Sequence, residues 1–190
     1  MSITIYETPI LNSILRRISL FILNLFGWQL EGEVPNIPKF VAIATHTSNW
    51  DFPIAILVAF AFKKKMSILA KKSLFKGPFG PFFKWMGCIP INRSQSSNVV
   101  DYLVKVFNEK REMILVLAPE GTRKKVEKWK SGFYHIAMGV KIPILLTFVD
   151  YLKKAAGIGP LIFPTGNYEA DLKRILAFYS NITGKYPDQT

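Results

Sequence analysis

The sequence predicts an α/β fold with a mixed, mostly parallel sheet covered by helices on both faces, and an N-terminal helix that associates with a membrane. Two observations lead to this fold class. Short apolar runs rich in β-branched residues alternate along the chain with longer segments of helical periodicity. Several of these runs are apolar throughout, which is typical of strands buried on both faces of a sheet. A chain of 190 residues is long enough to enclose such a core.

The first expected element is a helix over residues 10–28, whose apolar side chains form a broad face. Arg16 and Arg17 interrupt the apolar run, and the part after them is shorter than the roughly 20 residues that span a bilayer. These features favour a helix lying in the membrane interface, with a docked core helix as the alternative. We therefore treat residues 1–36 as an N-terminal amphipathic membrane-associating segment and residues 37–190 as a separate domain.

The later elements alternate along the chain. The expected strands span residues 40–44, 66–70, 88–92, 113–118, 142–149 and 161–163. The expected helices span residues 52–62, 97–110, 132–139 and 169–183. Asp51 is a candidate N-cap for the first of these helices. Residues 75–81 contain two glycines and two prolines, which exclude a regular helix there.

The composition is strongly basic and rich in apolar residues, with a formal net charge of +12 and 49% hydrophobic residues. This combination favours an anionic membrane surface as partner over nucleic acid, although Lys-rich runs with aromatics also suit phosphate backbones. Cys88 is the only cysteine, so neither an intramolecular disulfide nor a thiolate zinc cluster can form. Because the two histidines are far apart in the sequence, we expect no metal site.

The stretch between Phe52 and Val100 contains no Asp or Glu, but it carries many lysines, including Lys71 and Lys72, among aromatic residues. Such a segment suits the headgroup region of a bilayer, where lysines meet phosphates and aromatic rings lie at the boundary. A solvated basic face around an ordinary core explains the same pattern.

A histidine and a carboxylate follow the strand expected over residues 40–44: His46, and five residues later Asp51. Loops at the ends of buried strands present reactive groups on a rigid scaffold. A neutral imidazole can take a proton from a hydroxyl, and a nearby carboxylate fixes its tautomer and stabilises the imidazolium. The chain has no Gly-x-Ser-x-Gly motif, so the hydroxyl would belong to a substrate. The simpler alternative is that His46 is a loop histidine and Asp51 caps the next helix.

A second polar cluster follows the strand expected over residues 113–118, at the rim where ligands bind in α/β sheets. Its members are Glu120, Gly121, Thr122 and Arg123, with Arg93 in a similar position after an earlier strand. Gly121 permits a tight turn, and Arg123 supplies a guanidinium that matches phosphate. Glu120 is expected to orient the basic groups or to bind a polyol hydroxyl. The cluster therefore predicts a phosphate site.

Four motifs between Phe40 and Val149 give the chain a resemblance to the glycerolipid acyltransferases, and among them to the 1-acylglycerol-3-phosphate (lysophosphatidate) acyltransferases. The motifs are His46-x4-Asp51, Gly87-x-Ile89-x-Ile91-x-Arg93, Pro119-Glu120-Gly121-Thr122-Arg123 and Ile142-Pro143-Ile144. The chain departs from the family pattern at Thr45, Ala118 and Leu146.

The resemblance implies a role for each matching residue. The catalytic pair falls on His46 and Asp51, and the acceptor-phosphate site falls on Arg93, Glu120, Gly121, Thr122 and Arg123. Lys71 and Lys72 are expected on the donor side, because CoA carries phosphates and carrier proteins are acidic. Residues 37–190 would then form an acyltransferase domain.

The implied reaction moves a fatty acyl group from acyl-CoA or acyl-carrier protein to the hydroxyl of a lysophospholipid of the lysophosphatidate type, in phospholipid biosynthesis. It needs no cofactor beyond these co-substrates. We expect the protein on the cytoplasmic face of a membrane, peripheral or monotopic, in contact with the anionic surface and without a nucleic acid partner. The alternative functions are an acyl-thioester hydrolase and a non-enzymatic anionic-lipid-binding protein.

Overall fold

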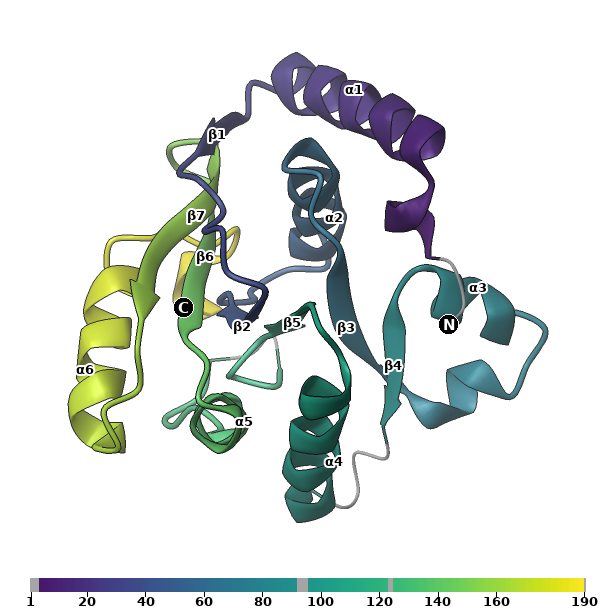
Figure 1. Ribbon diagram of the computed structural model, residues 1–190. Helices are drawn as coiled ribbons and strands as arrows, with labels where there is room; N and C mark the ends of the chain where they lie inside the picture. Colours follow the sequence, from purple (N-terminus) through teal and green to yellow (C-terminus); the bar gives the residue numbers. More distant parts are fainter. Residues whose placement is uncertain (1–3, 92–95, 123–124, 190) are drawn as a thin grey trace.

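A single sheet lies between two layers of helices (Figure 1). The computed structural model describes residues 4–91, 96–122 and 125–189. The strands are β1 (Gln29–Glu31), β2 (Lys39–Ile43), β3 (Met66–Lys71), β4 (Cys88–Ile91), β5 (Met113–Leu117), β6 (Ile144–Asp150) and β7 (Ala155–Ile162). The α-helices are α1 (Pro9–Leu25), α2 (Asp51–Ala61), α3 (Gly80–Trp85), α4 (Ser96–Glu109), α5 (Gly132–Val140) and α6 (Tyr168–Tyr179). Short 3-10 turns are η1 (Ile5–Glu7), η2 (Lys72–Phe75) and η3 (Pro187–Gln189).

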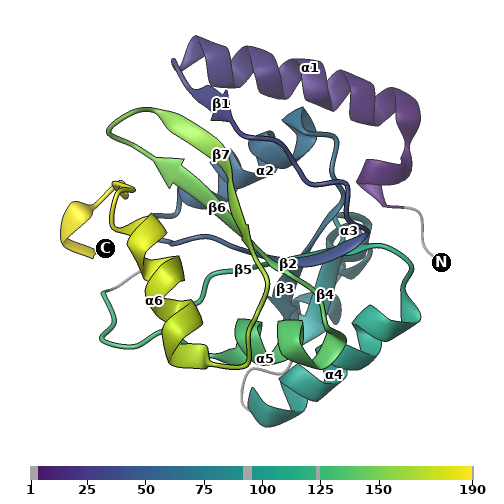
Figure 2. The same ribbon diagram turned by 60° about the vertical axis from the view of Figure 1, so that its left-hand side comes forward.

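The strand order is β1-β7-β6-β2-β5-β3-β4. Every pairing is parallel except that of β6 with β7. Helices α1 and α2 lie on one side of the sheet, and α4, α5 and α6 lie on the other, as two views agree (Figure 2). The predicted α/β class, with a mixed and mostly parallel sheet covered on both faces, is therefore confirmed.

Strand β2 is buried on both of its faces. Val41 and Ile43 pack in the larger core with residues of α4, α5 and α6, whereas Phe40 and Ala42 belong to a cluster on the opposite face. All four side chains are at most 3% exposed. Because successive side chains of a strand point to opposite faces, a strand covered on both sides needs a continuous apolar run, which β2 has.

The structure differs from the sequence-based elements in three places. Strand β1 and helix α3 were not predicted, and β7 spans eight residues where only residues 161–163 were expected. Glycines in β7 hide the strand pattern. A Cβ at Gly157 would lie 2.0 Å from the carbonyl oxygen of Glu31, so the close pairing of β7 with β1 requires glycine there. Helix α3 begins inside the 75–81 stretch, at Gly80, with proline in its first turn.

One edge of the sheet collects the polar residues of the two predicted clusters. Strands β6, β2, β5, β3 and β4 run in parallel, so their carboxyl ends lie at the same edge. His46 follows β2, Glu120 follows β5, Lys71 ends β3 and Tyr151 follows β6. Ligand sites of open α/β sheets lie outside this edge.

One side of helix α1 packs against α2, which it crosses at an angle (Figure 1). Leu23 on this side is 2% exposed, and Arg16 Nε donates a hydrogen bond to the carbonyl oxygen of Ala61 at 3.0 Å. Large exposed apolar side chains recur at helical spacing along α1: Ile10, Ile14, Ile18, Phe21 and Leu25. Within the described ranges, no helix has both the length and the apolar character needed to cross a membrane.

The predicted N-terminal segment, residues 1–36, also contains β1, which extends the sheet. The membrane association of this segment and the division of the chain at residue 36 remain predictions.

Candidate active site

The imidazole of His46 is held by the carboxylate of Asp51. Nδ1 of His46 lies 3.0 Å from Oδ2 of Asp51, and the side chain of His46 is 28% exposed. An ionised carboxylate can only accept hydrogen bonds, so we assign the proton to Nδ1, which leaves the lone pair on Nε2. No described residue forms a hydrogen bond with Nε2, so this nitrogen is available to a substrate. Asp51 is not the N-cap that the sequence predicts: Trp50 occupies that position, and Asp51 is the first residue of α2.

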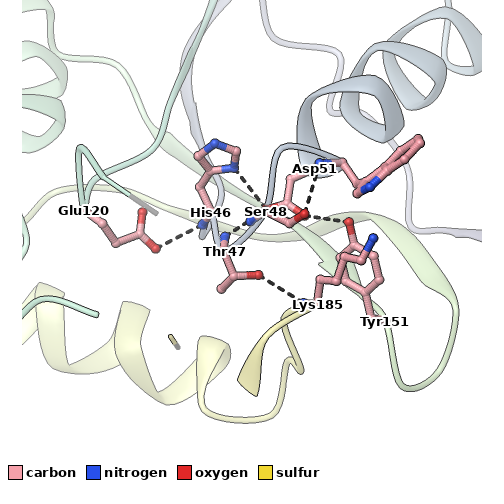
Figure 3. A network of polar contacts seen from close by, with 8 residues as sticks. His46, Thr47, Ser48, Asp51, Glu120, Tyr151 and Lys185 are labelled. Carbon is pink, nitrogen blue, oxygen red and sulfur yellow. Dashed lines mark hydrogen bonds and ion pairs between the residues drawn. The ribbon is translucent and has the colours of Figure 1, made fainter. Parts of the chain in front are cut away.

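The carboxylate of Asp51 is kept ionised by its surroundings (Figure 3). Oδ2 accepts hydrogen bonds from the backbone N–H groups of Thr47, at 2.8 Å, and Ser48, at 2.7 Å. Oδ1 accepts one from the hydroxyl of Tyr151 at 2.6 Å. Burial opposes ionisation, but the hydrogen bonds from His46, Tyr151 and the two backbone groups outweigh it and lower the pKa of Asp51. The carboxylate therefore stays charged at neutral pH.

Glu120 joins the second predicted cluster to the first. Its Oε1 accepts a hydrogen bond from the backbone N–H of His46 at 3.1 Å, and Figure 3 shows it on the side of His46 away from Asp51. Its Oε2 is buried and has no hydrogen-bond partner among the described residues. Burial raises the pKa of Glu120 to about 7, against the opposing effect of backbone hydrogen bonds and of His46. The turn after β5 and the loop after β2 thus meet at one site.

His46 and Asp51 form a pair that we call the dyad. The end of β2 and the loop after it, which lead to the dyad, are held by side chains of α6 and β6 and by the C-terminal segment. The hydroxyls of Tyr179 and Thr147 both donate to the carbonyl oxygen of Ile43, at 2.6 and 3.0 Å. The backbone N–H of Lys185 donates to Oγ1 of Thr47 at 3.0 Å. Because α6, β6 and the C-terminal segment each hold this loop, the position of His46 depends on residues far away in the sequence.

Comparisons with known proteins identify the family of the chain. A protein-family model described as "Acyltransferase" matches residues 29–147, well over half of the chain. The chain belongs to the acyltransferase family. The match includes β2, β5, His46, Asp51 and Glu120.

Two curated relatives share the name 1-acyl-sn-glycerol-3-phosphate acyltransferase. The protein from Cocos nucifera is 29% identical over 122 residues, which are 61% of this chain and 39% of that protein. The protein from Streptococcus pneumoniae is 32% identical over 117 residues, which are 60% of this chain and 42% of that protein. The chain spans about two fifths of the length of these relatives.

The fold resembles a solved member of the family. The crystal structure of the 1-acyl-sn-glycerophosphate (LPA) acyltransferase PlsC from Thermotoga maritima matches with a TM-score of 0.62 and 16% sequence identity. The match covers 90% of this chain and 77% of that one. At this identity the similarity supports the fold alone.

The structure describes part of the remaining cluster that the sequence analysis predicts to bind the acceptor phosphate. Gly121 has a φ of +66°, which favours glycine, and a Cβ there would lie 2.7 Å from Nζ of Lys130. Thr122 lies beside it in the same turn. Arg93 and Arg123 lie outside the described residues. The structure thus brings Glu120 to His46 and adds Lys130 beside Gly121, a cation that the sequence analysis did not single out.

Lys71 and Lys72 lie on the same edge of the sheet but apart from the dyad. Lys71 ends β3, Lys72 begins η2, and both side chains are exposed. Strand β5 separates β3 from β2, which corresponds to about 10 Å between those two strands. Among the described residues no hydrogen bond or ion pair connects either lysine to His46 or Asp51. Their donor-side role remains a prediction.

A cavity of about 560 Å³ lies beside Glu120, between α6 and residues 125–129. Its walls include apolar side chains of both segments, among them Val126, Trp129 and Leu172, with Lys125 and Lys128 also present. Thr45 and Glu120 form one end of it, whereas His46 and Asp51 do not line it.

The sequence analysis did not identify Tyr151, which contacts Asp51, or Lys185, which contacts Thr47. Tyr151 directly follows β6, and the rule that polar groups after parallel strands meet at one edge also applies to it. No local pattern marks Lys185, because its contact with Thr47 joins residues 138 positions apart.

The part of the chain that the structure describes contains no group of three or more His, Cys, Asp or Glu residues suited to a metal ion. The prediction that catalysis needs neither a metal nor another cofactor remains untested.

Proposed function

We propose that the chain transfers a fatty acyl group from an acyl thioester, acyl-CoA or acyl-carrier protein, to the hydroxyl of a lysophospholipid of the lysophosphatidate type. The single observation that carries the proposal is the 3.0 Å contact between Nδ1 of His46 and Asp51, which leaves Nε2 open at the ligand edge of the sheet. Membership of the acyltransferase family and the names of the two relatives support the same reaction.

In this mechanism Nε2 of His46 takes the proton of the acceptor hydroxyl as its oxygen attacks the thioester carbonyl carbon. Asp51 stabilises the imidazolium that forms and keeps the ring in its tautomer. The tetrahedral intermediate then collapses, the C–S bond breaks, and the leaving thiolate takes the proton from Nε2. Each turnover returns His46 to its neutral form, so no covalent acyl-enzyme is needed.

A transfer assay with radiolabelled acyl donor tests the proposal. Purified protein is incubated with acyl-CoA or acyl-carrier protein and with lysophosphatidate, lysophosphatidylcholine, glycerol 3-phosphate or no acceptor, and the products are identified by mass. We expect diacylated phosphatidate from lysophosphatidate, and a fall in kcat of about 10²–10⁴-fold in His46→Ala. His135→Ala is the matched control, because His135 is the other histidine of the chain and lies exposed on α5.

The same assay separates the alternatives. Release of free fatty acid at the same rate with and without acceptor would make the chain a thioester hydrolase. Turnover that survives His46→Ala at the wild-type rate would reject His46 as the base. Lack of any thioester turnover, together with retained lipid binding, would leave a non-enzymatic lipid-binding protein.

We propose in addition that α1 lies on an anionic membrane surface, on the cytoplasmic side where such lipids concentrate. Ile10 and Phe21 on this helix are 77% and 66% exposed. Transfer of such large apolar side chains from water into the membrane interface lowers the free energy, which favours binding of α1 to a membrane. The opposite side of α1 packs on α2, so the helix presents a fixed apolar stripe. The net charge of +12 complements anionic headgroups.

Vesicle co-sedimentation tests this surface. We expect binding to vesicles with anionic lipid to exceed binding to neutral vesicles, and the double variant Ile14→Ser/Phe21→Ser to lose most of it. Tyr102→Ser is the matched control, because Tyr102 is similarly exposed, at 43%, but lies on α4 on the other side of the sheet. Equal binding of both variants would show that α1 is not the contact surface.

A further inference from the structure

The dyad has a third partner on a neighbouring strand end. The hydroxyl of Tyr151 donates to Oδ1 of Asp51 at 2.6 Å, the shortest of the hydrogen bonds to that carboxylate. The other three contacts all fall on Oδ2. Tyr151 therefore anchors the second oxygen and, together with the donors to Oδ2, restricts rotation of the carboxylate about its Cβ–Cγ bond.

Tyr151 is itself held in place from two directions. Its ring and the ring of Trp28 form a T-shaped pair, with centroids 5.2 Å apart and an interplanar angle of 85°. Its backbone N–H donates to the carbonyl oxygen of Thr183 at 2.9 Å. Burial, followed by the hydrogen bond to Asp51, raises the pKa of Tyr151, so its hydroxyl stays protonated and remains a donor. A donor fixed in this way can impose one orientation on its acceptor.

We propose that Tyr151 is a positioning residue of the dyad, which acts on His46 through Asp51. The proposal rests on the function assigned to His46 above. Without the hydroxyl, Oδ1 loses its anchor and the carboxylate is held through Oδ2 alone, which loosens the direction of Oδ2 toward Nδ1. The ring of Tyr151 is not needed for this role, so Tyr151→Phe removes the hydrogen bond and keeps the packing on Trp28.

Steady-state kinetics of Tyr151→Phe give the first test. We expect kcat to fall about tenfold, roughly the effect of one lost hydrogen bond to a charged group, with both KM values within about twofold of wild type. Tyr102→Phe, which removes an exposed hydroxyl on α4, should leave kcat unchanged. His46→Ala in the same assay establishes that turnover comes from the dyad.

The pH dependence of kcat separates positioning from general damage. The titratable groups that face Asp51 are His46 on its own loop, Tyr151 after β6 and Glu120 after β5, while Tyr186 faces Tyr151. Loss of one donor makes the Asp51 carboxylate more basic and a stronger partner for the imidazolium, so the acid limb of the profile should move to higher pH by roughly half a unit or more in Tyr151→Phe. A structural defect alone would lower kcat without moving this limb.

Thermal unfolding supplies a readout that needs no turnover. The folded-state pKa of Asp51 lies below its usual value, so its stabilising contribution is present at neutral pH and is lost as the pH falls through that pKa. Because Tyr151→Phe removes part of this contribution, its Tm should fall less than that of wild type between pH 7 and pH 3.

Wild-type kcat with an unmoved acid limb in Tyr151→Phe, while His46→Ala is inactive, would overturn the inference and leave the proposed function intact. A lower kcat with an unmoved acid limb would also overturn it. If wild type transfers no acyl group, the proposed function fails, and the unfolding measurement alone decides whether Tyr151 holds Asp51.

Discussion

Replacement of Glu120 by glutamine should change how the stability of the protein depends on pH. Burial raises the pKa of Glu120 from its ordinary 4.5 to about 7. Between these values the unfolded chain releases the proton and the folded chain keeps it, so the free energy of unfolding falls as the pH rises. A difference of 2.5 units corresponds to about 2–4 kcal/mol at pH 8. A glutamine side chain cannot ionise, and its amide oxygen can still accept the hydrogen bond from the N–H of His46.

Urea unfolding at pH 5 and pH 8 measures this effect. We expect Glu120→Gln to be more stable than wild type at pH 8 by about 2–4 kcal/mol, or roughly 5–12 °C in Tm, and the gain to shrink toward pH 5. Glu112→Gln is the matched control, since Glu112 is exposed and should give no gain at either pH. The same stability difference between Glu120→Gln and wild type at both pH values would refute the reasoning, because it would show that Glu120 does not keep its proton in the folded chain.

Three further substitutions have defined outcomes. Asp51→Asn should lower kcat in the transfer assay by about 10²–10⁴-fold with little loss of folding by circular dichroism, because a neutral amide no longer stabilises the imidazolium. Tyr179→Phe removes the hydrogen bond from the tyrosine hydroxyl to the carbonyl oxygen of Ile43. It should lower the free energy of unfolding, measured with urea, by about 1–3 kcal/mol. Gly157→Ala places a methyl group 2.0 Å from a carbonyl oxygen of β1 and should cost about 1–3 kcal/mol, whereas Gly77→Ala, with no atom within 4 Å, should be neutral in the same unfolding experiment.

The contacts between the predicted site residues followed from local rules. A loop of four residues separates His46 from Asp51, and a carboxylate in the first turn of the next helix can reach back to the ring. Glu120 reaches the backbone of His46 because β2 and β5 are adjacent and parallel, so their ends meet. The sequence analysis expected both clusters at the ligand edge of the sheet, but it predicted no contact between Glu120 and the backbone of His46.

The parts that sequence reasoning missed depend on strand order and direction. Strand β1 has three residues and no apolar pattern, and it pairs only because Gly157 lets its backbone approach. The local sequence around Tyr151 does not mark it as a site residue. Its contact with Asp51 can be expected only once β6 is known to lie beside β2. The capping role predicted for Asp51 failed because the buried carboxylate binds the N–H groups of Thr47 and Ser48 in the preceding loop instead.

The reversal of direction between β6 and β7 explains why the segment after the N-terminal helix reaches Tyr151. Strand β6 ends at Asp150, which pairs with Ala155 at the start of β7, and Ala155 also pairs with Gln29 at the start of β1. Trp28 therefore lies at the same edge as the carboxyl ends of the parallel strands, in contact with Tyr151. Helix α1 ends at Leu25, so the helix proposed to bind the membrane is connected to Asp51 through Trp28 and Tyr151.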